Sequence, residues 1–352
     1  MSARSAMRRH ARGFTLIELM IAMTLGLGTI AATGYIYLGT IKTYRSHDSM
    51  SRLQEGGRFA FELIGKDLRM AGTTGCPYAT SANVLNNNID WEKDLFRMPV
   101  VSVAQDGAAG TETEFSDALR VLRADMTREY VVQAHDSAAG IFTLTGPHNI
   151  TAGQYMIATD CNHAVVFQAS VPAANQISHP VGGVPGNSTD RLGAGAVVYA
   201  FAPGSRLYRL DATSYFVANN VAGQPSLFRS RPTGAAGVIA REELIEGVQD
   251  LRITYVVDTS VPADGLADFV DPDGDGNPYL TAAQVDSAAV PGANTSQRWA
   301  RVVSARISSL IRTNEDGVVP VAQGYTFNGV ATVPADRRLR KVSTNVIRLR
   351  NR

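Results

Sequence analysis

An apolar run near the N-terminus constrains this chain more than any other feature. Residues 14–41 carry a single charged side chain, Glu18. A helix of this length, at about 1.5 Å per residue, extends roughly 42 Å, which exceeds the ~30 Å hydrocarbon core of a bilayer. We therefore predict that residues 14–41 form a membrane-spanning helix.

Charge on the two sides of this run predicts its orientation. Residues 1–13 contain four arginines and no acid, whereas mixed charges follow Ile41. Positive residues stay on the cytoplasmic side, so we expect a single pass through the membrane with the N-terminus in the cytoplasm and the rest of the chain exported. A cleaved secretory signal, whose apolar region is about 7–15 residues, and a plain signal anchor are the alternatives at this point.

Bulk composition excludes little else. The net charge is +1, charged residues make up 18% and aromatic residues 7% of 352 residues. This balance argues against a disordered chain and against one devoted wholly to nucleic acid. The length allows one large or two modest domains.

The junction between the basic leader and the apolar run carries a specific motif. Residues 12–20, Arg-Gly-Phe-Thr-Leu-Ile-Glu-Leu-Met, resemble the cleavage site of type IV prepilins and pseudopilins. In that family a membrane peptidase cuts after the glycine and methylates the new amine. The resemblance implies that residues 1–13 are a leader, that Gly13 precedes the cut, and that Phe14 becomes the N-terminus.

Glu18 needs a partner if it enters the membrane, because a carboxylate there costs about 2.5–3.5 kcal/mol. Cleavage removes the arginines and leaves one amine on Phe14, four residues away on the same helical face. Glu18 can pair with its own amine or, as the resemblance implies, with that of a neighbouring subunit during assembly. The alternative is an acid that stays hydrated near the interface.

Residues 42–72 continue the helix with a different pattern. Apolar residues recur at helical spacing, and charged residues occupy the other faces. Gly72 and Gly75 are helix-ending residues. We predict an amphipathic half whose stripe packs on a head formed by residues 73–352. The stripe comprises Leu53, Gly57, Phe61, Ile64 and Leu68, and the charged positions are Arg58, Glu62, Lys66 and Arg69.

Four further stretches resemble the PilW-type minor pilins: residues 58–72 followed by Gly75-Cys76, and residues 244–251, 301–307 and 346–352. This resemblance implies a low-abundance filament subunit that helps to initiate or cap pilus assembly. It implies other minor and major pilins, a prepilin peptidase, the inner-membrane assembly platform and a tip adhesin as partners, and an extracellular pilus as the final location. Minor pseudopilins of type II secretion share the same N-terminus and remain an alternative.

The head has the pattern of strands. Residues 303–312 alternate between apolar and polar with one exception, and residues 130–132, 141–144, 165–167 and 253–257 are further candidates. We predict an α+β fold in which a long N-terminal helix packs on a mostly antiparallel, β-rich head, in one lobe or two.

The two cysteines, Cys76 and Cys161, both lie in the exported part. An even count in an oxidising compartment predicts one disulfide. Two free buried thiols, or a metal site that includes His163, are the alternatives.

An acidic run matches the first half of a calcium loop. Asp271, Asp273, Asp275 and Asn277 alternate, with Gly276 at the sixth position, but Ala282 stands where a bidentate Glu is expected. Another acid would have to complete the coordination shell. A solvated acidic turn between strands remains the alternative.

The C-terminal region is basic but lacks the aromatic residues of a single-strand binder, so we expect a strand face or subunit surface instead of a nucleic-acid site. No catalytic motif is present, so we expect no enzyme and no required cofactor. A membrane-anchored exported binding module or enzyme is the rival from another class. The basic residues are Arg337, Arg338, Arg340, Lys341, Arg348, Arg350 and Arg352.

Overall fold

The computed structural model describes residues 15–86, 95–96, 98–183, 186–232, 239–274, 276–287 and 289–349. The chain divides into two units, residues 1–51 and 52–352. One continuous helix, α1 (Leu16–Met70), contributes to both units.

In the first unit, α1 presents its apolar side chains outward. Leu16, Ile30 and Ile36 are 77%, 71% and 67% exposed. The threonine hydroxyls are satisfied inside the helix; the Thr29 hydroxyl, for example, donates to the Gly26 carbonyl at 2.8 Å. The helix is long and apolar enough to cross a bilayer, with a mean hydropathy of 1.8 in its apolar part. The predicted apolar helix is confirmed.

In the second unit, the rest of α1 buries the predicted stripe. Leu53, Gly57, Ile64 and Leu68 are buried, Phe61 is half-buried, and the four predicted charged positions are exposed. The helix ends at Met70, and Gly72 follows in a left-handed conformation with a φ of 74°.

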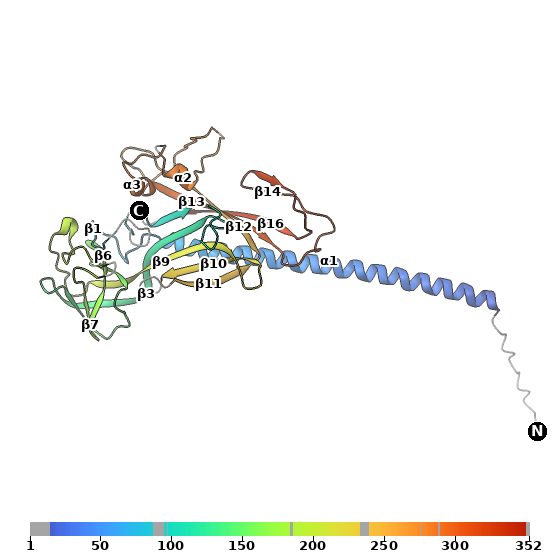
Figure 1. Ribbon diagram of the computed structural model, residues 1–352, viewed down its shortest axis with the longest axis horizontal. Coiled ribbons are helices and arrows are strands. Elements are labelled where there is room, and N and C mark those ends of the chain that lie inside the picture. The colour runs from blue at the N-terminus through green and yellow to red at the C-terminus, as the bar shows by residue number, and fades with distance from the viewer. Residues whose placement is uncertain are drawn as a thin grey trace, which may run out of the picture. The chain divides into compact units, whose positions relative to one another are not determined.

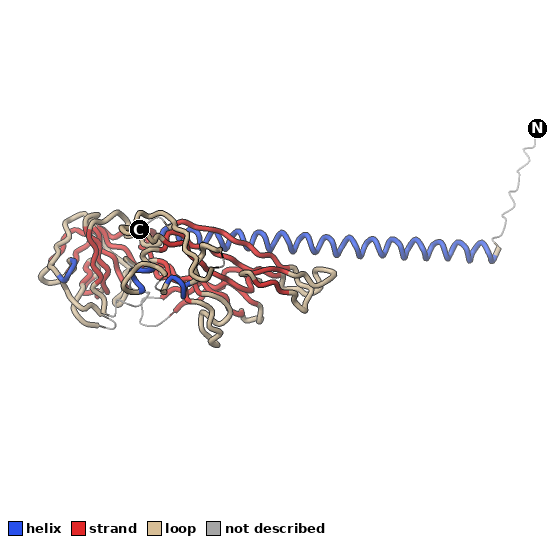
Figure 2. Tube along the Cα trace, turned by 90° about the horizontal axis from the view of Figure 1, so that it is seen from above, coloured by secondary structure: helices blue, strands red, loops and turns tan. Residues whose placement is uncertain are grey.

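Strands make up most of the second unit (Figures 1 and 2). The short helices are η1 (Ala194–Ala196), α2 (Ala282–Val285) and α3 (Thr295–Trp299). The strands are β1 (Thr80–Asn83), β2 (Val100–Val103), β3 (Ala118–Asp136), β4 (Ile141–Leu144), β5 (Tyr155–Thr159), β6 (His163–Gln168), β7 (Ser170–Ala173), β8 (Gln176–Ser178), β9 (Arg206–Asn219), β10 (Pro225–Pro232), β11 (Ile239–Glu246), β12 (Val248–Val257), β13 (Val302–Arg312), β14 (Tyr325–Phe327), β15 (Val330–Thr332) and β16 (Arg340–Arg348).

The largest sheet has the order β1-β6-β5-β9-β3-β4-β8-β7, with β2 on β3 and with β10 and β11 beyond β9. Among the strand pairs of the described residues, β1 and β6 are parallel and the others are antiparallel. The predicted α+β class, with a mostly antiparallel β-rich head, is therefore confirmed.

Strand β3 joins two hydrophobic clusters of the head. Its pairing with β9 shifts between Asp125 and Tyr130, and beyond this shift it pairs with β4. One cluster includes Leu122 and Tyr208, and the other includes Phe142. The predicted strands at 130–132, 141–144 and 165–167 lie in or next to the second cluster.

A second sheet, β12-β13-β16, packs against α1. The predicted alternation in β13 is confirmed, and its exception, Leu310, is also buried. Two helix glycines allow the close approach: a Cβ atom added to Gly57 would lie 3.0 Å from Ile311 Cδ1, and one added to Gly65 would lie 3.3 Å from Ile347 Cδ1.

Candidate functional site

The start of α1 is closed by a capping box. The backbone N–H and the hydroxyl of Thr15 both donate to Glu18 Oε2 at 2.9 Å, and the Glu18 N–H donates to the Thr15 hydroxyl at 3.3 Å. This reciprocal arrangement satisfies donors that a helix N-terminus leaves unpaired. This cap was not predicted, although its signal, a Thr three residues before a Glu, is present in the sequence.

The capping box fixes the Glu18 carboxylate at the N-terminal end of α1. Gly13 and Phe14, the predicted cleavage residues, lie outside the described residues. Thr15 is separated from the predicted new N-terminus by one peptide bond. The carboxylate therefore lies near the helix end at which cleavage would create a positive charge, and that end also favours negative charge through the helix dipole.

A buried ion network fixes the end of α1 in the head. Asp67 is 5% exposed, and its Oδ2 accepts a hydrogen bond of 2.6 Å from the Tyr215 hydroxyl. Its Oδ1 lies 3.2 Å from Arg123 Nε, and Arg123 extends to Asp211 at 2.6 Å. Burial, followed by the Asp67 carboxylate, raises the pKa of Tyr215, so this hydroxyl remains a donor. The sequence pattern assigned no role to Asp67.

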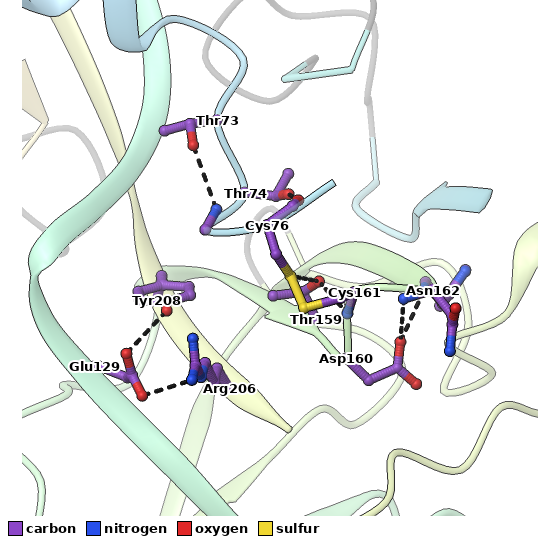
Figure 3. The surroundings of a disulfide bond; sticks show 12 residues. Thr73, Thr74, Cys76, Glu129, Thr159, Asp160, Cys161, Asn162, Arg206 and Tyr208 are labelled. Atoms are coloured by element: carbon purple, nitrogen blue, oxygen red, sulfur yellow. Dashed lines mark hydrogen bonds and ion pairs between the residues drawn. A yellow bond between two sulfur atoms is a disulfide. The ribbon is translucent and has the colours of Figure 1, made fainter. Parts of the chain in front are cut away.

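The predicted disulfide joins the region after α1 to the β5–β6 turn (Figure 3). Cys76 and Cys161 are bonded, with their Cα atoms 5.3 Å apart. Cys161 adopts a left-handed φ of 68°, and its N–H donates to the Thr159 hydroxyl at 3.3 Å. The alternative of two free thiols is wrong.

His163 does not join the cysteines in a metal site. Its Nδ1 lies 2.8 Å from the Thr80 hydroxyl and its Nε2 lies 2.6 Å from the Leu192 carbonyl. Since both ring nitrogens have partners and both sulfur atoms are in the disulfide, the metal alternative at Cys161 is wrong.

The acidic loop has the geometry of a tight polar turn. Asp271 accepts hydrogen bonds from the Gly274 and Gly276 N–H groups at 2.8 and 2.9 Å. Asp273 accepts from the Gln284 side chain at 2.8 Å, and Asn277 accepts from the Tyr279 N–H. Asp275 lies outside the described residues. Within the described part of the chain, no group of three or more His, Cys, Asp or Glu side chains is arranged to hold a metal ion.

Part of the basic C-terminal segment is internal to the fold. Arg340 is 5% exposed and binds Asp336 through both terminal nitrogens, at 2.5 and 2.8 Å. Its Nε donates to the Gln249 side chain at 3.1 Å. These contacts fix the start of β16. Arg350 and Arg352 lie outside the described residues.

Two family models match the chain. Residues 214–351 match the type IV pilus-assembly protein W family, and residues 8–32 match the prokaryotic N-terminal methylation motif. No curated protein and no solved structure matches. The resemblance to type IV pilin-like, PilW-type proteins is confirmed, and the two matches support a type IV pilus-related, prepilin-like protein. The methylation motif and the apolar helix are consistent with a membrane-anchored pilin.

Proposed function

We propose that this chain is a minor pilin of a type IV pilus, cut by a prepilin peptidase between Gly13 and Phe14. The observation that carries the proposal is Glu18, the motif acid that caps α1 and is the single charged side chain of the apolar part, residues 16–41. Once the leader is removed, the Phe14 amine supplies the counter-charge that the carboxylate needs in a membrane or in a bundle of helices.

In this proposal the helix anchors the subunit in the inner membrane, with its N-terminus cytoplasmic and its head periplasmic, until it enters the filament. Glu18 then pairs with the amine of a neighbouring subunit and sets the axial register between the two helices. The other minor and major pilins and the assembly platform are the partners. The head is structural, acts as no enzyme and requires no cofactor. The match over residues 214–351 supports a pilus over a type II secretion system.

Three substitutions separate charge pairing from helix capping. Glu18→Gln keeps an acceptor for the Thr15 donors but removes the charge, Glu18→Ala removes both, and Thr15→Ala weakens the cap by about 1 kcal/mol while keeping the charge. We expect all three chains to be cleaved. Both Glu18 variants should incorporate poorly into sheared filaments, whereas Thr15→Ala should incorporate nearly normally.

Mass spectrometry of the mature N-terminus and immunoblots of sheared filaments are the measurements. A Gly13 variant with a bulky side chain should remain uncut and serves as the processing control. Normal incorporation of Glu18→Gln would contradict the pairing argument. A wild-type protein that still begins with Met1 would overturn the whole proposal.

A further inference from the structure

A cavity of about 480 Å³ opens in the head between the second sheet and the β14–β15 hairpin. Strand β13 contributes Leu310 and Arg312. Because side chains alternate along a strand, these two lie on the face opposite Ile311, which contacts α1. The cavity is therefore separate from the surface that holds the helix. Its volume falls within the ~300–1,000 Å³ typical of small-molecule sites.

One wall of this cavity carries a guanidinium that lacks a counter-ion. Within the described ranges, Arg312 forms no ion pair, and its buried Nε has no hydrogen-bond partner. The acid nearby, Asp336, is bound by Arg338 and Arg340. Burial, together with the charges of Arg338 and Arg340, lowers the pKa of Arg312, so the fold disfavours this charge as it stands. An anion in the cavity would relieve that cost.

Asp250 in β12 also lines the cavity. Whereas Arg312 lacks an acceptor for its Nε, Asp250 lacks a donor for one of its oxygens. Its Oδ1 is buried without a hydrogen bond in the described structure, although Arg252 Nε lies 3.4 Å away. Burial raises the pKa of Asp250 to about 6. A hydrogen-bond donor on a ligand would satisfy this oxygen.

Aromatic side chains complete the cavity. Phe115, Tyr325 and Phe327 line it, and Phe327 is 7% exposed. Aromatic walls with a few fixed polar groups are the usual composition of a ligand site. Arg340, itself held by Asp336, lies 5.7 Å from the centre of the Tyr325 ring.

We propose that this cavity binds a small organic acid that carries one carboxylate and at least one hydrogen-bond donor. Arg312 receives the carboxylate, Asp250 accepts from the donor, and the aromatic rings pack on the carbon skeleton. An acidic sugar and a free amino acid both have this chemistry. The proposal goes beyond pilus assembly, and Arg312 is independent of Glu18, so ligand binding and filament incorporation can fail separately.

The test is calorimetric titration of the full chain in detergent micelles with matched probe pairs. D-galacturonate is compared with D-galactose, and L-phenylalanine with L-phenylalaninol; each second member lacks the carboxylate. Binding of one acid without its neutral match supports the proposal and identifies the source. If neither acid binds, or if each neutral match binds equally well, the proposal is overturned.

Variants locate the binding. Arg312→Gln should weaken it about 10- to 100-fold, the effect of losing one charged hydrogen bond. Arg312→Lys keeps the charge and should weaken it less, which provides a second folded variant if the first does not fold. Arg348→Gln, on β16 and away from the cavity lining, should leave affinity unchanged. Unchanged affinity in folded Arg312→Gln or Arg312→Lys would overturn the assignment.

Discussion

The Tyr215 hydroxyl donates a hydrogen bond of 2.6 Å to Asp67, across 148 positions of the sequence. Both residues are buried, and Arg123 adds an ion pair to the same carboxylate. This contact links the last turns of α1 to the centre of the largest sheet. The helix is thus held in the head by a polar connection as well as by its apolar stripe.

Asp67→Ala should lower the free energy of unfolding of the head by about 3–5 kcal/mol, because it leaves Arg123 and Tyr215 buried without this partner. Tyr215→Phe removes the hydrogen bond to Asp67 but leaves the ion pair with Arg123, so the loss should be smaller, about 1–3 kcal/mol. Guanidinium denaturation of the detergent-solubilised chain, followed by circular dichroism, measures both. Glu62→Gln, on the exposed face of the same helix, is the matched control and should change stability by about 0.5 kcal/mol at most. Equal midpoints for Asp67→Ala and Glu62→Gln would contradict the anchoring role.

Replacing both cysteines by serine should destabilise the head by up to about 4–5 kcal/mol, the chain-entropy value for a loop of this length. The same loss should follow when the wild-type chain is treated with a reductant. Thermal melting of the wild type, the double variant and the reduced wild type compares the three. A double variant as stable as the oxidised protein would show that the crosslink contributes nothing.

The stability of the hydrophobic cluster around Phe142 should decrease in acid because of two histidines, His135 and His179. His135 Nε2 lies 3.1 Å from His179 Nε2, and burial lowers the pKa of each ring from 6.5 to about 4. As pH falls from about 6.5 to 4, the unfolded chain takes up protons first, so the free energy of unfolding should decrease across this window. The nearby acids Asp136 and Asp190 act in the opposite sense, but burial outweighs them.

His135→Gln combined with His179→Gln should flatten this dependence. The pH dependence of stability is measured from the midpoints of denaturation at pH 7, 5.5 and 4. His148→Gln is the control, because His148 lies outside the His135–His179 pair. The explanation fails if the double variant loses stability with acid as steeply as the wild type.

The alternating acids of residues 271–277 give a sequence-based prediction of calcium-dependent stabilisation, which the polar turn seen in the structure does not test. Asp271→Asn, Asp273→Asn and Asp275→Asn together should abolish any rise in melting temperature caused by calcium, because they remove the hard anionic oxygens that the ion prefers. The measurement compares melting in calcium with melting in chelator, using magnesium as a control ion. A wild-type melting temperature that is the same in calcium and in chelator would contradict the prediction.

Local patterns predicted the local structure well. The helical stripe and the alternation of β13 each follow from one period within one segment, and the even cysteine count predicted the disulfide. Asp67 could not be found in this way, because its partners Arg123 and Tyr215 are distant in the sequence and only the folded sheet brings them together. Arg312 could not be identified from the sequence for the same reason. It forms no ion pair among the described residues because Asp336 is bound by Arg338 and Arg340. Thr15 is a different case, because its capping signal is local: Glu18 follows three residues later in the sequence.

The crosslink between Cys76 and Cys161 has a mechanical consequence if the chain is put under tension. Residues 77–160 lie inside the covalent loop. When the head is pulled between α1 and β16, the force passes through the sulfur atoms, and about 290 Å of extended chain stays unavailable for lengthening. Even after its sheets have unfolded, the oxidised head would therefore have a shorter maximum extension than the reduced head. It would also resist stretching at a smaller extension.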